Sequence, residues 1–330
     1  MTAILISGCG GFLGSHILHE VLTETDWDVV AVDSFRHNGG TDRILDALGD
    51  SEGFVVDDYR KRVRLLIHDL AAPVNARHQA DVGPIDYVVH AAARVSVDDS
   101  IADPYGHVHN NVDTTLNMLA LAVDLAPARY LHISTDEVYG DGSPVYVDEH
   151  RPSSPYAASK AACEDLTRAW RTTYGLPASI VTSANLFGER QSQLAFIPKV
   201  IRQIRDGEPV TIHTTGPYQK VARRCYTYAP NLAAWIVSYL PYADDGILRH
   251  CLSGQTEIDV LTLARLIAEI MNRPLEHKLE PGADSRPGFD DRYWSLPNDP
   301  TWTPAISLSA GLERTVQWFL DHPRWLVSDD

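Results

Sequence analysis

The chain has 330 residues, of which 44% are hydrophobic and 22% are charged, and 44 acidic against 28 basic residues give a formal net charge of −16. This length predicts one large or two modest domains, in a composition ordinary for a globular protein. The negative charge would repel nucleic acid and anionic lipid, and the longest apolar runs are too short to span a bilayer. We therefore expect neither a nucleic-acid nor a membrane partner.

The cysteines and histidines argue against a disulfide-rich and a metal-dependent protein. Four cysteines, at positions 9, 163, 225 and 251, form no CxxC pair, and the N-terminus has no secretory signal pattern. We therefore expect reduced thiols and a cytoplasmic protein. The 14 histidines are scattered, and His107 and His109 lie close together without a supporting ligand pattern, so no metal site is predicted.

Short apolar runs alternate with helical segments through the first half of the chain. The runs, which we expect to be strands, lie at 3–8, 28–33, 62–70, 86–93, 128–134 and 178–187. The segments with helical spacing lie at 16–24, 111–126 and 159–175. Near-continuous apolar strands that alternate with helices indicate a parallel sheet covered on both faces. The predicted fold class is therefore α/β, with a Rossmann-type doubly wound parallel sheet.

The pattern changes after residue 188. A loop and a helix are expected within 190–210, and two more helices at 261–272 and 309–322. We expect a sheet domain of residues 1–187 plus about 225–255, and a smaller C-terminal region of about 188–224 plus 256–330. The strand ends and the smaller region would form a cleft, which is where open α/β sheets bind ligands.

The first expected strand runs into GCGGFLG, residues 8–14, which opens the first helix. Gly8 permits the turn, Gly11 lets the backbone approach a pyrophosphate, and Gly14 lets helix and strand pack closely. Asp33 ends the second strand, where a carboxylate binds an adenosine ribose and repels a 2′-phosphate. The pattern predicts NAD rather than NADP, and the alternative is a tight turn without a ligand. The cofactor contacts expected in these segments also include Phe12, Leu13 and Ser34.

Two further strand ends are candidate cofactor contacts. Asp69 and Leu70 follow the third expected strand, where they would contact the adenine. Ala91, Ala92 and Ala93 follow the fourth, where small residues let the backbone lie close to a cofactor. The alternative for the alanines is simple packing.

SSPYAASK, residues 153–160, places a tyrosine and a lysine on one face of an expected helix. Ser154 would cap this helix and Pro155 would be its first residue. Tyr156 and Lys160 are four residues apart, so their side chains share a face. A lysine ammonium near a phenol lowers the phenol's pKa from about 10 toward neutrality. A phenolate made in this way can take the proton of an alcohol while a hydride leaves to a nicotinamide.

HISTDEVYGDG, residues 132–142, places a hydroxyl and two carboxylates at the end of the fifth expected strand. Repulsion between the carboxylates of Asp136 and Glu137 would raise the pKa of one of them, which could then act as an acid beside a base. Thr135 lies directly before them. The alternative is a turn with two solvated acids.

These stretches resemble the extended short-chain dehydrogenase/reductase superfamily, and within it the nucleotide-sugar 4,6-dehydratases of the dTDP-glucose 4,6-dehydratase type. STDEVYG is the most specific stretch, because related epimerases usually lack the Asp-Glu pair. The similar stretches, spread from residue 8 to residue 293, are GCGGFLG, VDSF, VDDSI, NNVDTT, ISTDEVYGDG, SSPYAASKAACEDLTRAW, YGLP, FIPKVI, RRCYTY and RPGFDDRY.

The resemblance implies a role for each matching catalytic residue. Thr135 would bond the sugar hydroxyl that is oxidised, Tyr156 would be the base for that oxidation, and Lys160 its tuning cation. Asp136 would protonate the leaving hydroxyl. Glu137 would remove the proton next to the new ketone.

The resemblance also implies binding residues and an assembly. Asn111 matches the superfamily's structural asparagine, and Asn111, Tyr156 and Lys160 would also contact the cofactor. The helices at about 104–126 and 156–174 would pair in a homodimer. The substrate, a nucleotide-diphosphate sugar, would contact Ser96, Thr135, Asn185, Arg224, Arg286 and Arg292.

The chain departs from the dehydratase pattern in the parts that would hold nucleotide and sugar. Val95-Ser96 stands where Ser-His is usual, and Asp99 where an arginine is usual. NLFG at 185–188 replaces Asn-Asn-Tyr-Gly, APN at 229–231 replaces Val-Asp-Asp, and Phe289 replaces a histidine. Such swaps remove hydrogen-bond partners, so we expect altered substrate preference on preserved chemistry.

Two other functions remain open at this stage. The first is a nucleotide-sugar epimerase or oxidoreductase, in which Glu137 moves a proton and no water is eliminated. Asp136 argues against it, because simple epimerisation has no use for an acid aimed at a leaving group. The second is a non-catalytic NAD-binding protein. The presence of Thr135, Tyr156 and Lys160 beside the two acids argues against that.

Overall fold

The computed structural model describes residues 2–37, 39–49, 55–140, 149–215, 220–242, 246–254, 256–281, 299–300 and 302–327. Three residues singled out in the sequence, Arg286, Phe289 and Arg292, lie outside this described part. The chain divides into two compact units. Of the described residues, the first unit holds 2–140, 149–182 and 232–251, and the second holds 183–231 and 252–327.

The first unit is built on a seven-stranded sheet with the order β11-β6-β5-β4-β1-β2-β3. Neighbouring strands pair in parallel, as β1 does with both β2 and β4. This order places the switch point between β1 and β4, and the predicted Rossmann-type fold is confirmed. The strands are β1 (Ala3–Ser7), β2 (Asp28–Asp33), β3 (Val63–Ile67), β4 (Tyr87–His90), β5 (Arg129–Thr135), β6 (Ala178–Ser183) and β11 (Arg249–Cys251).

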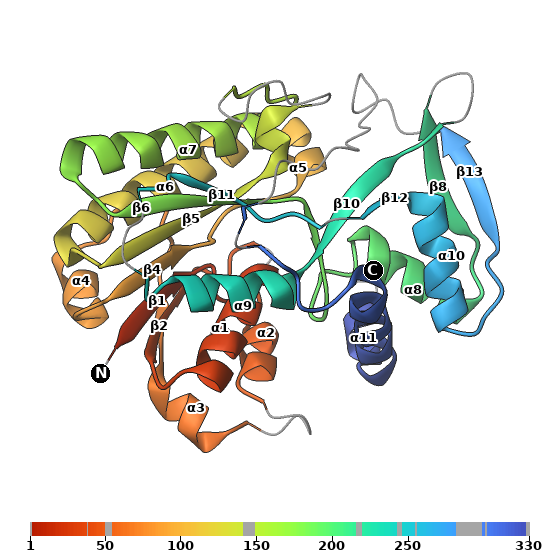
Figure 1. Ribbon diagram of the computed structural model, residues 1–330, viewed down its shortest axis with the longest axis horizontal. Coiled ribbons are helices and arrows are strands. Elements are labelled where there is room, and N and C mark those ends of the chain that lie inside the picture. The colour runs from red at the N-terminus through yellow and green to blue at the C-terminus, as the bar shows by residue number, and fades with distance from the viewer. Residues whose placement is uncertain are drawn as a thin grey trace. The chain divides into compact units, whose positions relative to one another are not determined.

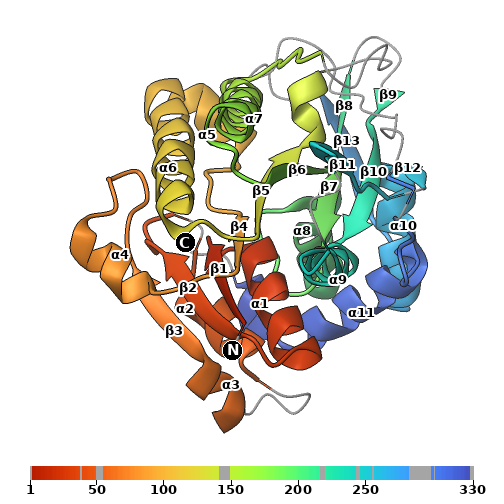
Figure 2. The ribbon, with the colours of Figure 1, turned by 60° about the vertical axis from the view of Figure 1, so that its left-hand side comes forward.

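Helices cover both faces of this sheet. Helices α6 and α7 lie side by side on one face, while α1 and α9 lie on the other (Figures 1 and 2). None of the helices within the described residues combines the length and apolar character needed to cross a membrane. The helices are α1 (Phe12–Glu24), α2 (Thr41–Ala47), α3 (Asp57–Arg62), α4 (Ala76–Val82), α5 (Val97–Ala102), α6 (Pro104–Leu125), the 3₁₀ turn η1 (Asp136–Tyr139), α7 (Pro155–Tyr174) and α9 (Ala229–Tyr239).

Helices α6 and α7 begin with the same local signal, a capping side chain followed by proline. Asp103 Oδ1 accepts a hydrogen bond from the Gly106 amide at 2.9 Å. Ser154 Oγ accepts one from the Ala157 amide at 3.1 Å, which confirms the start predicted for that helix. Each cap satisfies an amide that the first helical turn leaves without a partner.

The second unit contains two three-stranded sheets and a core of its own. Phe187, Ile201, Leu263 and Phe319 are among the buried residues of this core. The strand orders are β12-β10-β7 and β13-β8-β9. The elements are β7 (Asn185–Phe187), α8 (Phe196–Asp206), β8 (Val210–Thr215), β9 (Lys220–Val221), β10 (Arg223–Tyr228), β12 (Glu257–Asp259), α10 (Val260–Ile270), β13 (His277–Pro281), α11 (Leu308–Asp321) and the 3₁₀ turn η2 (Pro323–Leu326).

The single strand predicted at 178–187 is wrong. The chain leaves the seven-stranded sheet after β6, and β7 pairs in parallel with β10 instead. Between them the Ala184 amide donates to Ser253 Oγ at 3.2 Å, so a side chain replaces the ladder partner at the break. A continuous apolar run does not reveal this break, because both short strands are buried.

Candidate functional site

The glycine loop joins β1 to α1 and is shaped by close backbone contacts. Gly8 has a φ of +73°, and a Cβ placed there would lie 2.7 Å from the Ala92 amide nitrogen. A Cβ on Gly14 would lie 2.1 Å from the Gly8 carbonyl oxygen. The loop therefore lies against the end of β4, and the start of α1 lies against the loop.

The N-terminus of α1 is the part of this loop suited to an anion. Gly11 is its N-cap residue, and no side chain caps the first turn by a hydrogen bond. Leu13 is buried, and the ring of Phe12 contacts the His16 ring edge-on at a centroid distance of 5.2 Å. These two residues would therefore offer their backbone amides, and an open helix N-terminus suits a pyrophosphate.

Asp33 is held at the base of the same loop. Its Oδ2 accepts a hydrogen bond from the Gly10 amide at 2.9 Å, and its Oδ1 accepts one from the Phe35 amide at 2.9 Å. Ser34 Oγ accepts a bond from the Arg36 amide at 3.3 Å, which tightens the turn that follows β2. The carboxylate of Asp33 is thus oriented beside the glycine loop, where it can still accept bonds from a ribose diol.

The end of β3 lies next to Asp33. Asp69 forms an ion pair with Arg36 and accepts a bond from the Ala71 amide at 3.0 Å. Leu70 is buried in the hydrophobic core, and its carbonyl accepts a bond from Asn117 Nδ2 at 2.8 Å. The Leu70 side chain packs into the core, so Asp69 is better placed than Leu70 to contact an adenine with its side chain.

The alanines after β4 lie against the end of β1. The Ala91 amide donates to the Ser7 carbonyl at 3.2 Å, and the Ala92 amide to Ser7 Oγ at 3.4 Å. Ala93 follows as a half-buried residue. The structure therefore brings the alanines and the glycine loop together at the switch point between β1 and β4.

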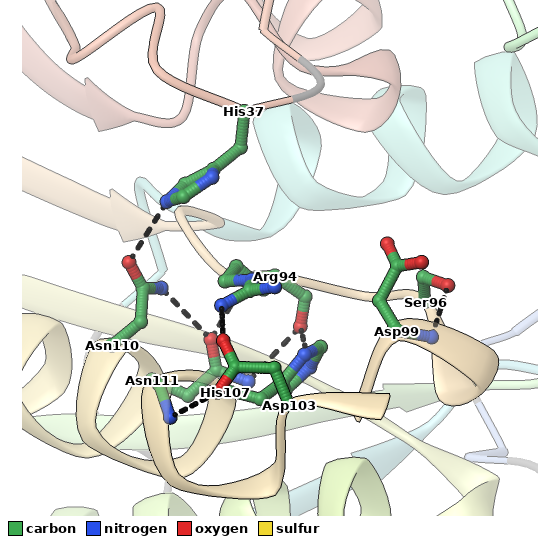
Figure 3. Close-up of polar contacts among 9 residues, drawn as sticks. His37, Arg94, Ser96, Asp99, Asp103, His107, Asn110 and Asn111 are labelled. Carbon is green, nitrogen blue, oxygen red and sulfur yellow. Dashed lines mark hydrogen bonds and ion pairs between the residues drawn. The ribbon is translucent and has the colours of Figure 1, made fainter. Parts of the chain in front are cut away.

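Asn111 fixes the backbone that follows these alanines (Figure 3). Its Oδ1 accepts a bond from the Arg94 amide at 2.8 Å, and its Nδ2 donates to the Arg94 carbonyl at 3.0 Å. The same Nδ2 group donates to Ser159 Oγ at 2.9 Å, and His107 Nε2 donates to the Arg94 carbonyl at 2.9 Å. Buried Asn111 thus joins the exit of β4 to both α6 and α7.

Ser96, a predicted substrate contact, caps a helix in this structure. Its Oγ accepts a hydrogen bond from the Asp99 amide at 3.1 Å at the start of α5 (Figure 3). A hydroxyl in this role can still donate one bond to a ligand.

The predicted acid and base lie in one turn at the end of β5. Thr135 is the last residue of the strand, and Asp136 and Glu137 open η1. Thr135 Oγ1 accepts a bond from the Glu137 amide at 3.3 Å and donates to Asp136 Oδ1 at 3.3 Å. We call residues 135–137 the catalytic turn, after the role predicted for them from the sequence. The 3₁₀ element η1, which contains Asp136 and Glu137, packs against α7.

Tyr156 and Lys160 lie in the first turns of α7, and both are buried. Lys160 Nζ donates to the Ile133 carbonyl at 2.6 Å, so it lies beneath β5 just before the catalytic turn. Burial lowers the pKa of Lys160, while the nearby Cys163 and Glu164 oppose this shift. The structure therefore brings the lysine predicted from the helix together with the strand that carries Thr135.

Two histidines near Lys160 were missed in the sequence. His132 Nε2 lies 3.3 Å from Lys160 Nζ, and the rings of His132 and His90 are 5.4 Å apart between centroids. Burial and the charge of Lys160 lower the pKa of His90 to about 3 and that of His132 well below its usual value. Both rings are therefore neutral at ordinary pH. The available signal was that His90 ends the predicted fourth strand and His132 lies within the predicted fifth, and the two residues pair in register in the sheet.

The substrate residues predicted in the second unit lie on neighbouring strands. Asn185 opens β7 and pairs in register with Tyr226 of β10, and Arg224 lies earlier in β10. Arg224 Nη1 donates to the Arg223 carbonyl at 2.8 Å. Within the described part of the chain, no group of three or more histidine, cysteine or acidic residues could hold a metal ion.

Comparison with known proteins gives a consistent result. The family described as "NAD dependent epimerase/dehydratase" matches residues 4–249. The dTDP-glucose 4,6-dehydratase 1 of Escherichia coli K12 is 29% identical over 354 residues, covering 98% of this chain and 94% of the relative. The dTDP-glucose 4,6-dehydratase of Streptomyces venezuelae, solved with NAD bound, has a TM-score of 0.81 and 27% identity, covering 98% of each chain. The UDP-glucuronic acid 4-epimerase of Bacillus cereus, with a TM-score of 0.82, 24% identity and coverage of 97% and 100%, shares the fold.

The residues present fit the cofactor of this family. The close backbone packing of the glycine loop, the open N-terminus of α1 and the oriented carboxylate of Asp33 suit a dinucleotide with a free ribose diol. The predicted cofactor is confirmed as NAD, and so is the family resemblance. The chain belongs to the NAD dependent epimerase/dehydratase family.

Proposed function

We propose that the protein is a nucleotide-sugar 4,6-dehydratase-like enzyme. It oxidises the C4 hydroxyl of a nucleotide-diphosphate sugar, eliminates water across C5 and C6, and reduces C6. The observation that carries this proposal is the catalytic turn, in which Asp136 and Glu137 directly follow Thr135 and are packed on the helix of Tyr156 and Lys160. Relatives named dTDP-glucose 4,6-dehydratase support it.

The oxidation uses the residues of β5 and α7. Thr135 bonds the C4 hydroxyl, and Tyr156 takes its proton. Lys160, held by the Ile133 carbonyl, stabilises the phenolate by its positive charge. NAD, which the glycine loop and Asp33 would hold, would supply the acceptor for the C4 hydride and the source of the hydride that reduces C6.

The elimination uses the two carboxylates. The ketone at C4 makes the C5 proton acidic, and Glu137 removes it and later returns a proton to C5 when C6 is reduced. Asp136 gives a proton to the C6 hydroxyl as the C6–O bond breaks, so that a C5–C6 double bond forms and water leaves. Their adjacent positions in η1 support a division of labour between one base and one acid.

The residues proposed to bind the substrate lie near the positions where the chain departs from the dehydratase sequence pattern. We propose that the second unit contributes Asn185 and Arg224 to nucleotide-sugar binding, together with Arg286 and Arg292, which lie outside the described residues. Val95-Ser96 stands where Ser-His is usual in the dehydratases, and this difference supports a substrate preference other than that of the dTDP-glucose enzymes. We also propose a cytoplasmic location, in keeping with four buried cysteines that form no disulfide within the described residues. We propose in addition a homodimer that pairs α6 and α7.

A panel of nucleotide sugars tests this function. The purified protein is incubated separately with dTDP-glucose, UDP-glucose, CDP-glucose, GDP-mannose and UDP-N-acetylglucosamine. The products are analysed by mass spectrometry for loss of water and by NMR spectroscopy for epimerisation. At least one sugar should lose one water and gain a keto group. An epimer without any loss of water would instead assign the protein to the epimerases, and the Asp136 acid role would be wrong.

A further inference from the structure

A buried charged cluster lies behind the catalytic turn and has no part in the mechanism above. It consists of Ser134, His150, Glu164 and Arg249, which we call the Glu164 cluster. Glu164 is fully buried, on the same face of α7 as Lys160 and one turn after it. Buried charges are costly unless they are paired, so this cluster needs an explanation.

The contacts among these four residues meet at the Glu164 carboxylate. Its Oε1 accepts a hydrogen bond from Ser134 Oγ. Its Oε2 accepts one from His150 Nε2 at 2.9 Å and forms an ion pair with Arg249 Nη2. Burial alone would raise the pKa of Glu164, but the bond from His150 and the charge of Arg249 outweigh it and lower the pKa. Glu164 is therefore ionised.

These contacts hold the catalytic turn from both sides. Ser134 is the residue directly before Thr135, so the bond to Glu164 fixes the strand end from which the turn starts. On the other side, the Arg249 guanidinium lies over the ring of Tyr139 at 5.4 Å, and Tyr139 is the last residue of η1. Ser134 and Tyr139 thus flank the turn, and one carboxylate on α7 anchors both.

We propose that Glu164 is a positioning residue which, through Ser134 and Arg249, fixes Thr135, Asp136 and Glu137 relative to Lys160 on the same helix. The proposal rests on the proposed function in assigning the chemistry to that turn. It predicts that the cluster affects the rate of the chemical steps more than substrate binding, because a small displacement of reacting groups lowers the rate strongly.

The chain offers a matched control for the arginine. Arg129 is also buried, and its guanidinium lies over the ring of Tyr239 at 4.5 Å. It donates to Tyr239 Oη at 2.9 Å and to the Tyr242 carbonyl. These partners belong to α9 and the turn after it rather than to η1. Losing Arg129 should therefore cost stability without displacing the catalytic turn.

The test compares Arg249→Gln, the double variant Glu164→Gln with Arg249→Gln, and the control Arg129→Gln. The double variant removes both charges together, so that no buried charge is left without its partner if Glu164→Gln alone does not fold. Two measurements are made on the NAD-bound protein. The first is kcat and KM for water loss from whichever panel sugar the wild type converts. The second is hydrogen–deuterium exchange of a peptide that spans residues 132–140.

The expected result is a fall in kcat of about tenfold or more, with KM within about twofold of the wild type, in Arg249→Gln and in the double variant. Exchange should rise in the 132–140 peptide and stay unchanged in β1 and β2. Arg249→Lys, which keeps the charge, should restore part of the rate. Arg129→Gln should leave both kcat and that exchange near the wild-type values.

Two results would overturn the proposal. One is a folded double variant with wild-type kcat, and the other is a loss of rate in Arg129→Gln equal to that in Arg249→Gln. If the wild type converts no sugar in the panel, the proposed function fails, but exchange still decides the positioning role. Faster exchange confined to the 132–140 peptide supports that role, and unchanged exchange excludes it.

Discussion

The glycine loop and the catalytic turn both stand at the carboxyl ends of strands in one sheet, but they are built from different atoms. The loop is a backbone structure, in which Gly8 and Gly14 leave no room for a Cβ. The turn is a side-chain structure, in which Thr135 bonds its neighbours and buried Glu164 anchors the flanks. The loop should therefore lose its function when a side chain is added to one of its glycines. The turn should lose its function when a charged or polar side chain is removed.

Gly14→Ala should have the largest effect, which is loss of bound NAD. The added Cβ would lie 2.1 Å from the Gly8 carbonyl oxygen, a backbone atom that cannot rotate away, so the start of α1 must move off the loop. The measurement is the NAD content of the purified protein after denaturation. Gly40→Ala is the control, because the nearest atom to a Cβ there is Arg43 Nη1 at 3.8 Å. Full NAD content in Gly14→Ala would show that the loop does not depend on this contact.

Glu137→Gln should have the next largest effect and should act on a different step. Without the carboxylate the C5 proton stays, so water loss should slow by about a hundredfold or more. The oxidation should survive, so NAD should still be reduced on mixing with the sugar, whereas Tyr156→Phe should prevent that reduction. For both variants, NADH absorbance measures the oxidation step and mass spectrometry measures the loss of water.

The control for Glu137→Gln is Glu149→Gln, which removes an exposed carboxylate that pairs with Arg151. It should change neither step. If Glu137→Gln lost water at the wild-type rate, the division of labour within the catalytic turn would be wrong.

A chain of buried polar groups joins the two regions and predicts a dependence of stability on pH. Ser7 Oγ, at the end of β1, lies 2.6 Å from His90 Nδ1, and His90 neighbours His132, which contacts Lys160. Burial and the charge of Lys160 lower the pKa of His90 to about 3 in the folded state. The unfolded state therefore binds more protons below the ordinary value of about 6.5, and stability falls as pH drops from there toward 3.

His90→Gln should remove this contribution. When the pH is lowered from about 7 to about 5, the free energy of unfolding should fall more in the wild type than in the variant. The difference should grow by up to roughly 1.4 kcal/mol for each pH unit below about 6.5. Urea unfolding at the two pH values measures it. His277→Gln, which replaces an exposed histidine, should keep the wild-type pH dependence. The same slope in His90→Gln and wild type would show that His90 is not buried as a neutral ring.

The sequence allowed the loop to be predicted better than the surroundings of the turn. The spacing of Gly8, Gly11 and Gly14 and the interval between Tyr156 and Lys160 are local patterns, because each follows from the geometry of one turn or one helix. The sheet followed from alternating apolar runs, which report burial along one segment at a time.

The parts that escaped prediction depend on contacts between distant segments. Glu164 reads as an ordinary helical residue until β11 brings Arg249 against it, and β11 is only three residues long. The division of the predicted strand at Ala184 depends on Ser253. Ser96 was expected to contact the substrate, and in the structure its hydroxyl caps α5. Serine is a preferred N-cap residue, so the local sequence is equally consistent with this second role.

The smallest effect expected is that of a helix cap, and it separates stability from positioning. Ser154 Oγ caps α7 through the Ala157 amide at 3.1 Å, and Ser307 Oγ caps α11 through the Ala310 amide at 3.3 Å. Replacing either serine by alanine should cost about 1 kcal/mol of stability. Tyr156 lies in the first turn of α7, so Ser154→Ala should also lower kcat by about two- to fivefold, because fraying there moves the base.

Ser307→Ala should leave kcat unchanged, since α11 belongs to the second unit and contains none of the proposed catalytic residues. The two variants are compared by thermal unfolding and by kcat measured well below both melting temperatures. Equal losses of rate would show that activity follows overall stability. A loss of rate confined to Ser154→Ala would show that the position of Tyr156 depends on the cap of its own helix. The proposed dependence of the catalytic turn on the Glu164 cluster is of the same kind.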